Sequence, residues 1–288
     1  MDVWLLGDCQ LELTTKYLIR AALRSVEMIL FRSRRRSFFK FFTSIYPIAL
    51  VLAIVWGESL NYYYWRLFWN IPQSNSLESL GILIVADPQL VGFRNENHMI
   101  GPLTRWDCDR FLSKGFSHAV SVTKPDLIVF LGDLFDEGVE ASESEIEWTL
   151  SRFKNIFFYS ESPKIFISGD NDVGGEMEPV QSVLTTRFRN TFSNSFPAST
   201  LFNHLILTEV NLMNGEVHKI SESSAFPNLN VVLSHISFGY SSYHDPEKMA
   251  EALKPDLILS GHDHKVSFYR MNFPFSFLQK YQFSDRPE

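Results

Sequence analysis

The sequence predicts a layered α/β domain with flanking helices, preceded by one N-terminal transmembrane helix. Short apolar runs alternate along residues 80–288 with segments that have helical spacing. Such alternation is typical of α/β domains with two central sheets or one twisted sheet. A long uncharged stretch lies before them, and several apolar runs end in aspartate or histidine.

The composition fits one sizeable domain with an appended segment. The chain has 288 residues, of which 45% are hydrophobic and 15% aromatic, and this length suits such an arrangement. Its two cysteines, Cys9 and Cys108, are too few for a disulfide framework. Residues 1–40 carry eight basic and four acidic residues, whereas the whole chain has a net charge of −7. The asymmetry indicates that the two parts face different surroundings.

Residues 41–57 form the predicted transmembrane helix. They are uncharged and mostly apolar, and with Phe38 and Phe39 they approach the ~20 residues that span a bilayer. A buried core helix is the alternative, and Pro47 inside the stretch weakens the membrane interpretation slightly. Residues 58–79 predict an interfacial aromatic belt followed by a polar linker.

The basic run Arg32 to Arg36 lies immediately before the apolar stretch. Positive charge beside a span stays on the cytosolic side, so we expect residues 1–40 in the cytosol and residues 80–288 in a lumen or outside. A nuclear signal or a nucleic-acid patch is the alternative for a basic run. The adjacent span favours the membrane, and we expect no nucleic-acid partner.

The chain is organised around residues 128–138, where an apolar run ends in Gly132 and Asp133 and is followed by Asp136. A short, wholly apolar run with β-branched residues predicts a buried parallel strand. A carboxylate just past such a strand lies at the sheet edge where α/β proteins bind ligands. For Asp133 taken alone, a cap of the next helix is the alternative.

Four further apolar runs end in the same way. Residues 82–86 precede Asp87 and Gln89, residues 164–168 precede Gly169 and Asp170, residues 231–234 precede His235, and residues 256–260 precede His262 and His264. We therefore expect these side chains at one edge of the sheets. Carboxylates and imidazoles that converge on one point are the donors that divalent transition metals require. The five endings together predict a metal site.

The intervening segments predict helices and further strands. Helical spacing covers residues 103–122, before Pro125, and residues 178–192. Ser142 and Glu145 have the spacing of a capping box, which opens another helix. The remaining predictions are a helix at residues 246–253 and strands at residues 205–210, 230–233, 257–259 and 266–269.

The five strand endings, in this chain order, resemble the motifs of the calcineurin-like metallophosphoesterases over residues 80–270. That family has D-x-H, G-D-x-x-D, G-N-H-D, a single H and G-H-x-H, where this chain has Asp87-x-Gln89, Gly132-Asp133-x-x-Asp136, Gly169-Asp170-Asn171-Asp172, His235 and Gly261-His262-x-His264. The resemblance implies a hydrolase of phosphoric diesters with two divalent metal ions. Two such ions can clamp a phosphoryl group for in-line displacement.

The resemblance also implies a ligand set. Asp133 would bridge the two ions; the first ion would also bind Asp87, Gln89 and His264, and the second Asp170, His235 and His262. Catalytic roles fall on Asp133, Asp170, Asn171 and Asp172. Asp136 would orient a ligand or the turn at Gly132, with a helix cap as the alternative. These mixed ligands suit Mn, Zn or Fe, and we expect manganese.

Three positions depart from the family motifs. Gln89 stands for a histidine and offers a weaker ligand, while Asp170 stands for an asparagine and adds negative charge. Asn171 stands for the histidine that protonates the leaving alkoxide. An amide cannot do this, and general acid catalysis is worth ~10²–10⁴-fold. His98 and His244 are candidate proton donors in loops, with an ordinary surface histidine as the alternative for each.

Residues 86–92, residues 131–138 and the membrane helix look most like the metallophosphoesterase-1 branch of the family. This likeness implies removal of ethanolamine phosphate from the glycan of glycosylphosphatidylinositol (GPI) anchors, in membranes between the ER and the Golgi. GPI-anchored proteins or glycolipids and the bilayer would be the partners. That branch continues beyond the G-H-x-H motif through further sheet segments and a second span, so we expect a shortened C-terminal part here.

Two other functions stay open at this point. Gln89, Asn171 and the short C-terminal part are compatible with a catalytically impaired trafficking or binding protein of the same fold. A soluble nucleotide or protein phosphatase is the third hypothesis, and it requires the apolar stretch to be core.

Overall fold

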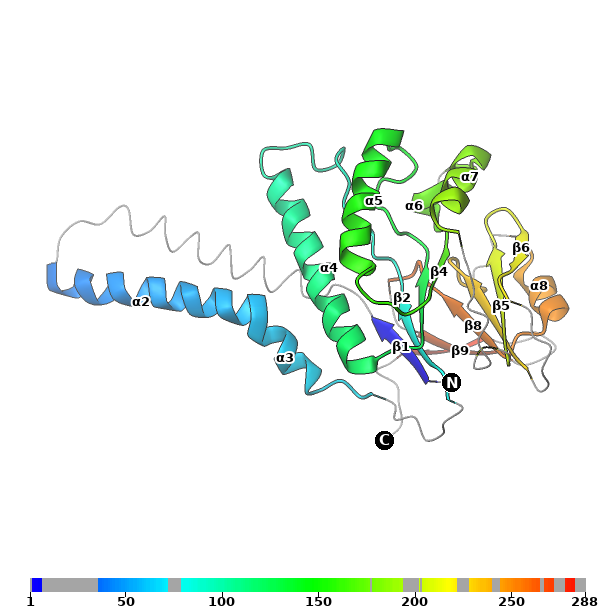
Figure 1. Cartoon of the computed structure of the whole chain (residues 1–288), viewed down its shortest axis with the longest axis horizontal. Coiled ribbons are helices and arrows are strands. Elements are labelled where there is room, and N and C mark those ends of the chain that lie inside the picture. The colour runs from blue at the N-terminus through cyan, green and yellow to red at the C-terminus, as the bar shows by residue number, and fades with distance from the viewer. Residues whose placement is uncertain are drawn as a thin grey trace. The chain divides into compact units, whose positions relative to one another are not determined.

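The computed structural model describes residues 2–6, 36–71, 79–176, 178–193, 202, 204–221, 228–239, 244–264, 267–271 and 278–282. The chain divides into two compact units, one of Met1–Gly7 with Ile71–Glu288 and one of Asp8–Asn70 (Figure 1). Residues 7–35, which are most of the expected cytosolic segment, and residues 72–78 of the expected linker lie outside the described part.

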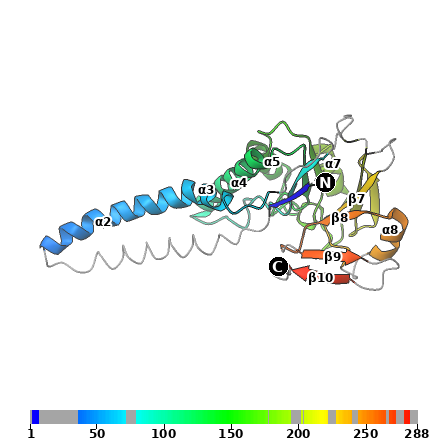
Figure 2. The same cartoon turned by 90° about the horizontal axis from the view of Figure 1, so that it is seen from below.

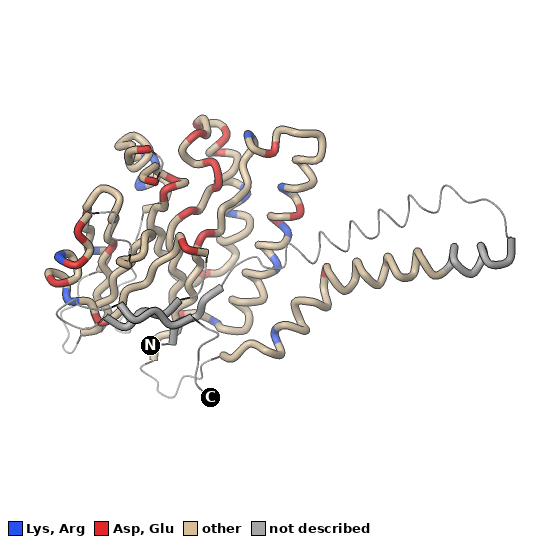
Figure 3. The backbone as a smooth tube through the Cα atoms, turned by 180° about the vertical axis from the view of Figure 1, so that it is seen from behind, with Lys and Arg blue, Asp and Glu red and all other residues tan. Residues whose placement is uncertain are grey.

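The described part of the second unit is helical from Arg36 to Arg66. It consists of α2 (Arg36–Val55), a π-helical turn (Trp56–Leu60) and α3 (Asn61–Arg66). By length and composition, Ile45–Arg66 can cross a membrane, and none of its apolar window is buried within the protein. Figure 3 shows an uncharged run along this helix up to Glu58. The candidate span therefore overlaps the predicted residues 41–57 and extends through the start of the expected aromatic belt.

Two four-stranded sheets form the centre of the other unit (Figures 1 and 2). The first sheet has the order β1-β2-β3-β4 and is parallel throughout. The second has the order β6-β5-β7-β8 and is parallel except for β6. The strands are β1 (Asp2–Leu6), β2 (Gly81–Val85), β3 (Leu127–Leu131), β4 (Lys164–Ile167), β5 (Leu205–Asn211), β6 (Glu216–Lys219), β7 (Leu229–Ser234) and β8 (Leu257–Ser260). The structure therefore has the first of the two predicted arrangements, the one with two central sheets.

Five helices accompany the sheets, and the longer ones match the predictions. The N-terminus of α5 has the expected capping box, in which the Ser142 N–H donates to Glu145 Oε2 at 2.7 Å and the Glu145 N–H donates to Ser142 Oγ at 3.4 Å. The helices are α4 (Gly101–Thr123), α5 (Glu143–Phe157), α6 (Asp170–Val173), α7 (Ser182–Thr191) and α8 (Pro246–Leu253).

Alternation along the buried strands produces a layered domain. In β2, Ile82 and Ile84 belong to the cluster between the two sheets, whereas Leu83 and Val85 belong to the cluster that α4 and α5 cover. On the far side of the second sheet, Ala250 of α8 packs with Val232 of β7. Because successive side chains of a strand point to opposite faces, each sheet is buried on both sides, in the order helices, sheet, sheet, helix.

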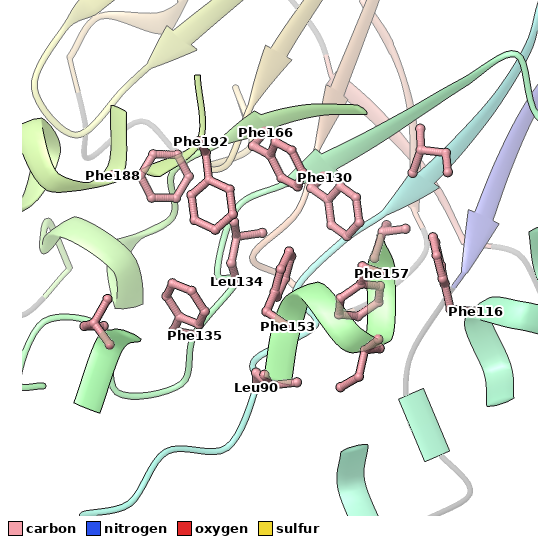
Figure 4. Packing of buried hydrophobic residues seen from close by; sticks show 14 of the residues in the cluster. Leu90, Phe116, Phe130, Leu134, Phe135, Phe153, Phe157, Phe166, Phe188 and Phe192 are labelled. Atoms are coloured by element: carbon pink, nitrogen blue, oxygen red, sulfur yellow. The ribbon is translucent and has the colours of Figure 1, made fainter. Parts of the chain in front are cut away.

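Phenylalanine dominates the layer between the first sheet and its helices (Figure 4). Phe153 of α5 is fully buried, and its ring centroid lies 4.7 Å from that of Phe157 and 5.6 Å from those of Phe130 and Phe192. Tilted and edge-on rings at such spacings add to the free energy of area burial. This cluster holds α5 against β3, the strand that ends in Asp133.

The helices α4 and α8 are each followed by the same five residues, Lys-Pro-Asp-Leu-Ile, at residues 124–128 and 254–258. Lys124 and Lys254 close the helices with left-handed φ of 46° and 47°. Asp126 then accepts the N–H of Gly81 at 2.9 Å, and Asp256 accepts the N–H of Asn230 at 2.8 Å. The same turn thus starts β3 and β8, two strands that carry predicted ligands. The sequence analysis missed this repeat.

Three described strands lie where the sequence predicted none: β1, β6 and β10. β1 pairs parallel with β2, with Asp2 opposite Gly81. Beyond His264, β9 (Ser267–Met271) pairs antiparallel with β10 (Leu278–Gln282). The expectation of a single strand after His264 is therefore wrong.

Candidate metal centre

The predicted site residues follow the carboxyl ends of five parallel strands. Asp87 and Gln89 follow β2, Asp133 follows β3, Asp170 follows β4, His235 follows β7, and His262 and His264 follow β8. Because parallel strands end at the same edge of a sheet, the residues converge from both sheets.

Unusual backbone conformations are concentrated at these residues. Among described residues other than glycine, seven have positive φ, and five of these are predicted ligands, with φ from 38° to 69°. Side chains with a Cβ rarely adopt this region, and such strain gathers at functional sites. The five are Asp87, Gln89, Asp133, His262 and His264, and the other two are the helix-ending lysines.

Two glycines allow the ligands to approach one another. Gly132 has φ of 91°, and a Cβ there would collide with the ring of His235. A Cβ at Gly169 would collide with the carboxylate of Asp133. Both positions therefore require a residue without a side chain.

Four donors form a compact set: Asp133, Asp170, His235 and His262 each offer one ligand atom, and these atoms lie within 4.8 Å of one another. Asp170 Oδ1 lies 2.8 Å from His235 Nε2 and 3.0 Å from His262 Nδ1. Asp133 Oδ1 lies 3.4 Å from His235 Nε2. The first three residues of this set are buried, and His262 is half-buried.

His235 is fixed in an orientation that suits a metal ligand. Its Nδ1–H donates to the backbone oxygen of Leu131 at 2.8 Å, and its Nε2 faces Asp170. Burial lowers the pKa of His235, but the hydrogen bond to Asp170 and the charges of Asp133 and Asp87 outweigh it and raise the pKa to about 9. A divalent cation can take the place of the Nε2 proton, and metal-bound histidines commonly have their other nitrogen tied in this way.

Charge at the centre also fits a cation. The side chains of Asp87, Asp133 and Asp170 are 6%, 2% and 7% exposed, and buried carboxylates are costly unless they are paired or bind metal. Burial raises the pKa of Asp87. Burial also acts to raise the pKa of Asp170, but hydrogen bonds from His235 and His262 outweigh it and lower the pKa. Oxygen and imidazole donors of this kind suit Mn, Zn or Fe.

The predicted ligands of the first ion lie beside this set. Both oxygens of Asp87 accept the backbone N–H of His262, at 3.0 Å each. The Gln89 amide nitrogen lies 3.2 Å from Asp133 Oδ2 and 3.2 Å from His264 Nε2. His264 is exposed and Gln89 half-buried. The structure therefore brings all seven predicted ligands to one place.

Asn171 and Asp172 have different surroundings. Asn171 donates its backbone N–H to Asp133 Oδ1 at 3.0 Å and its side-chain amide to Asp133 Oδ2 at 3.1 Å. Asp172 is buried and accepts the N–H groups of Gly169, Leu134 and Phe135 at 2.9 to 3.2 Å. Burial, followed by the charge of Asp133, raises the pKa of Asp172 to about 7. Asp172 thus joins the two loops that carry Asp133 and Asp170.

Asp136 lies outside the compact donor set. It is half-buried, a hydrogen bond joins its side chain to Asn95, and burial raises its pKa. Because Ser142 caps α5, the helix-cap interpretation of Asp136 is wrong. Of the two candidate proton donors, His98 lies with its Nε2 2.6 Å from Glu96 Oε2, and His244 lies against Gly215.

The sequence analysis missed Glu137. This carboxylate is 5% exposed and accepts the backbone N–H groups of Arg94 and Asn95 at 2.7 Å each. A Cβ at Gly92 would collide with it. Glu137 therefore fixes the loop that follows Gln89. The only signal in the sequence was its place beside Asp136.

Comparison with known proteins agrees with the motif order. The sequence profile of the calcineurin-like phosphoesterases matches residues 80–266. The chain is 29% identical to Metallophosphoesterase 1 of Ailuropoda melanoleuca over 187 residues, which are 62% of this chain and 46% of the relative. It is 29% identical to Metallophosphoesterase 1 of Danio rerio over 150 residues, 50% of this chain and 38% of the relative.

A more distant similarity extends further along the chain. Cell division control protein 1 of Saccharomyces cerevisiae is 23% identical over 224 residues, which are 70% of this chain and 44% of that protein. The chain thus spans less than half the length of each of these three relatives. The profile match covers more than half of the chain, and the sheets place its motif residues around one centre. This chain belongs to the calcineurin-like phosphoesterase family.

Proposed function

We propose that this protein is a membrane-anchored, metal-dependent phosphodiesterase that binds two divalent cations. Manganese is the metal that we expect at both. The observation that carries the proposal is the convergence of Asp133, Asp170, His235 and His262 within 4.8 Å. When bound, the ions would supply Lewis-acid stabilisation of phosphoryl charge and activation of water. Asp87, Gln89, Asp133 and His264 would hold one ion, and Asp133, Asp170, His235 and His262 would hold the other.

The chain's own groups perform three further tasks. Leu131, through its carbonyl oxygen, holds the His235 ring with Nε2 directed to Asp170. Asp172 ties the loop after β3 to the loop after β4. The Asn171 amide donates to Asp133 Oδ2 and has no proton to give to a leaving group at neutral pH. Leaving groups that are stable as anions would therefore react fastest.

The proposed substrate is a phosphoethanolamine diester on the glycan of a GPI anchor. Its support is the likeness of residues 86–92 and 131–138 to the metallophosphoesterase-1 branch and the candidate span beside the domain. GPI-anchored proteins or glycolipids would be the partners, in membranes between the ER and the Golgi. Release of ethanolamine phosphate from a purified GPI glycan, followed by mass spectrometry, tests this. A protein that cleaves aryl diesters but not this glycan would refute the substrate and leave the phosphodiesterase standing.

The proposed boundaries are residues 1–40 in the cytosol, 41–57 in the membrane, 58–79 as belt and linker, and 80–288 in the lumen. The basic run Arg32 to Arg36 beside the span supports this orientation. In this orientation a single crossing would place residues 2–6 and β2, which pair in the structure, on opposite sides of the membrane, so the experiment that tests the orientation also tests this pairing. Alkaline carbonate extraction tests the anchor. Protease protection of tags at the two ends tests the orientation, which fails if both tags are protected alike.

The activity itself is tested on the full chain in detergent. After chelation, hydrolysis of bis(p-nitrophenyl) phosphate is measured with Mn, Zn or Fe added. Asp133→Asn should lower kcat/KM more than ~100-fold, because loss of metal contacts costs at least that order of affinity or activity. Glu140→Gln, the same change at an exposed carboxylate, serves as the control. A wild type that binds no metal and cleaves no diester overturns the proposal.

The hydrogen bond of Asn171 to Asp133 favours one second candidate, a catalytically impaired binding protein. A wild type that retains metal but hydrolyses no diester under any of these conditions would support that candidate.

A further inference from the structure

The two cation positions are not equivalent in this chain. In the proposed assignment, position one comprises Asp87, Gln89, Asp133 and His264, and position two comprises Asp133, Asp170, His235 and His262, the four donors that lie within 4.8 Å of one another. Asp133 is common to both, and each has one further carboxylate. The positions therefore differ by one imidazole, since Gln89 takes the place that a histidine takes on the other side.

Position two is assembled before a cation arrives. Asp170 Oδ1 already lies 2.8 Å from His235 Nε2 and 3.0 Å from His262 Nδ1. The Leu131 oxygen fixes the His235 ring, and Asp133, Asp170 and His235 are buried. A preformed and buried donor set loses little conformational entropy on binding.

At position one, the side chain of Gln89 stands between two of the other ligands. Its amide group lies 3.2 Å from Asp133 Oδ2 and 3.2 Å from His264 Nε2. A carboxylate oxygen accepts hydrogen bonds and does not donate them, so the NH₂ side of the amide must face Asp133. This NH₂ group thus lies between Asp133 and His264, two of the donors assigned to position one.

A cation at either position displaces hydrogen bonds between ligands, but at position two it only takes the place of the protons between the two imidazoles and Asp170, whereas at position one the Gln89 side chain must also reorient. To coordinate the cation, the Gln89 amide has to turn its oxygen inward and give up the hydrogen bonds to Asp133 and His264. The oxygen is then a weaker ligand than imidazole for a transition metal. His264 is exposed, so water competes for this position more than for position two. Substitution of a residue that only hydrogen-bonds to a metal ligand typically lowers the affinity for the metal ~10–100-fold. Replacement of a ligand itself should lower the affinity at least as much.

From this asymmetry we infer that the chain retains one divalent ion at position two and binds a second, at position one, weakly and reversibly. The free manganese concentration would then set how much of the protein carries both ions, so Gln89 makes the centre responsive to metal supply. This inference rests on the proposed function, because it concerns the same centre.

The test counts metal ions and does not depend on turnover. The full chain in detergent is stripped with a chelator, loaded with excess MnCl₂ and desalted, and manganese per chain is measured by mass spectrometry. We expect about one ion in the wild type after desalting and about two in equilibrium dialysis against excess manganese. The Gln89→His variant should retain about two manganese ions per chain after desalting. The Gln89→Ala variant, which removes the amide, should retain about one. His235→Ala should lose the retained ion.

Electron paramagnetic resonance gives a second readout. The desalted wild type should show the spectrum of isolated Mn²⁺, and Gln89→His the spectrum of a spin-coupled pair. Two retained ions in the wild type would overturn the inference, as would a retained ion that survives His235→Ala and is lost in His264→Ala. A wild type that binds no manganese even in dialysis would instead overturn the proposed function, so the two failures are distinguishable.

Discussion

Replacing Glu137 with alanine should loosen the loop that follows Gln89 and destabilise the protein. The carboxylate is 5% exposed and accepts the N–H groups of Arg94 and Asn95 at 2.7 Å each. A hydrogen bond to a charged group contributes ~1.5–3 kcal/mol. The two bonds set an upper limit of about 6 kcal/mol, and because both donors are only partly buried, water can reach them after substitution. We therefore expect a loss of about 3 kcal/mol in the free energy of unfolding.

The assay is thermal unfolding of the full chain in detergent, followed by circular dichroism with chelator present. About 3 kcal/mol corresponds to a lower Tm by roughly 6–12 °C in a domain of this size. Glu137→Gln can accept only one of the two N–H groups and should lose about half as much. Glu140→Ala, the same substitution at an exposed position three residues on, should change Tm by less than about 2 °C.

A double-mutant cycle with Gly92 separates this contact from general packing. The Cβ of Gly92→Ala would displace the Glu137 carboxylate, so the single variant should lose a similar free energy by the same route. In the Glu137→Ala background, Gly92→Ala should cost little, giving an interaction energy of at least ~1 kcal/mol. Additive losses, or a Glu137→Ala variant no less stable than Glu140→Ala, would refute the reasoning.

Three further predictions concern stability. Ser142→Ala removes the cap of α5 and should cost about 1 kcal/mol in urea unfolding; an unchanged midpoint would contradict the capping role. Phe153→Ala opens a cavity in the aromatic cluster and should cost ~3–5 kcal/mol, and a loss below 1 kcal/mol would show that the cluster is loosely packed. Burial raises the pKa of Glu209, so its contribution to stability is complete below the unfolded-state pKa and is lost as pH rises through the folded-state pKa. The Tm of Glu209→Gln relative to wild type should therefore increase from pH 4 to pH 8, and a constant difference would contradict this.

Several parts of the fold follow from local chemistry. The spacing of Ser142 and Glu145 defines where α5 begins, because the cap uses atoms three residues apart. Short apolar runs are buried strands here because both faces of each sheet are covered. The element order and the strand ends then place Asp87, Asp133, Asp170, His235 and His262 at one edge.

Other features had no local signal. β1 gains its place by pairing with β2, a strand about eighty residues away, and five residues are too few to show a period. Whether the second half forms its own sheet depends on packing between Ile84 and residues such as Leu207 and Val231. Glu137 had no local signal because its backbone partners lie more than forty residues away in the chain.

The order of residue types at the strand ends was readable from the sequence, and it identified the phosphoesterase motifs and a set of residues that could hold metal. The tertiary structure alone decided how those residues meet. It directs the Gln89 amide to Asp133 and His264, gathers His235 and His262 on Asp170, and uses Asp172 to tie two loops. The physical reason is range: caps and strand runs depend on neighbours in the chain, whereas each of the contacts at Gln89, His235 and His262 joins residues from separate strands.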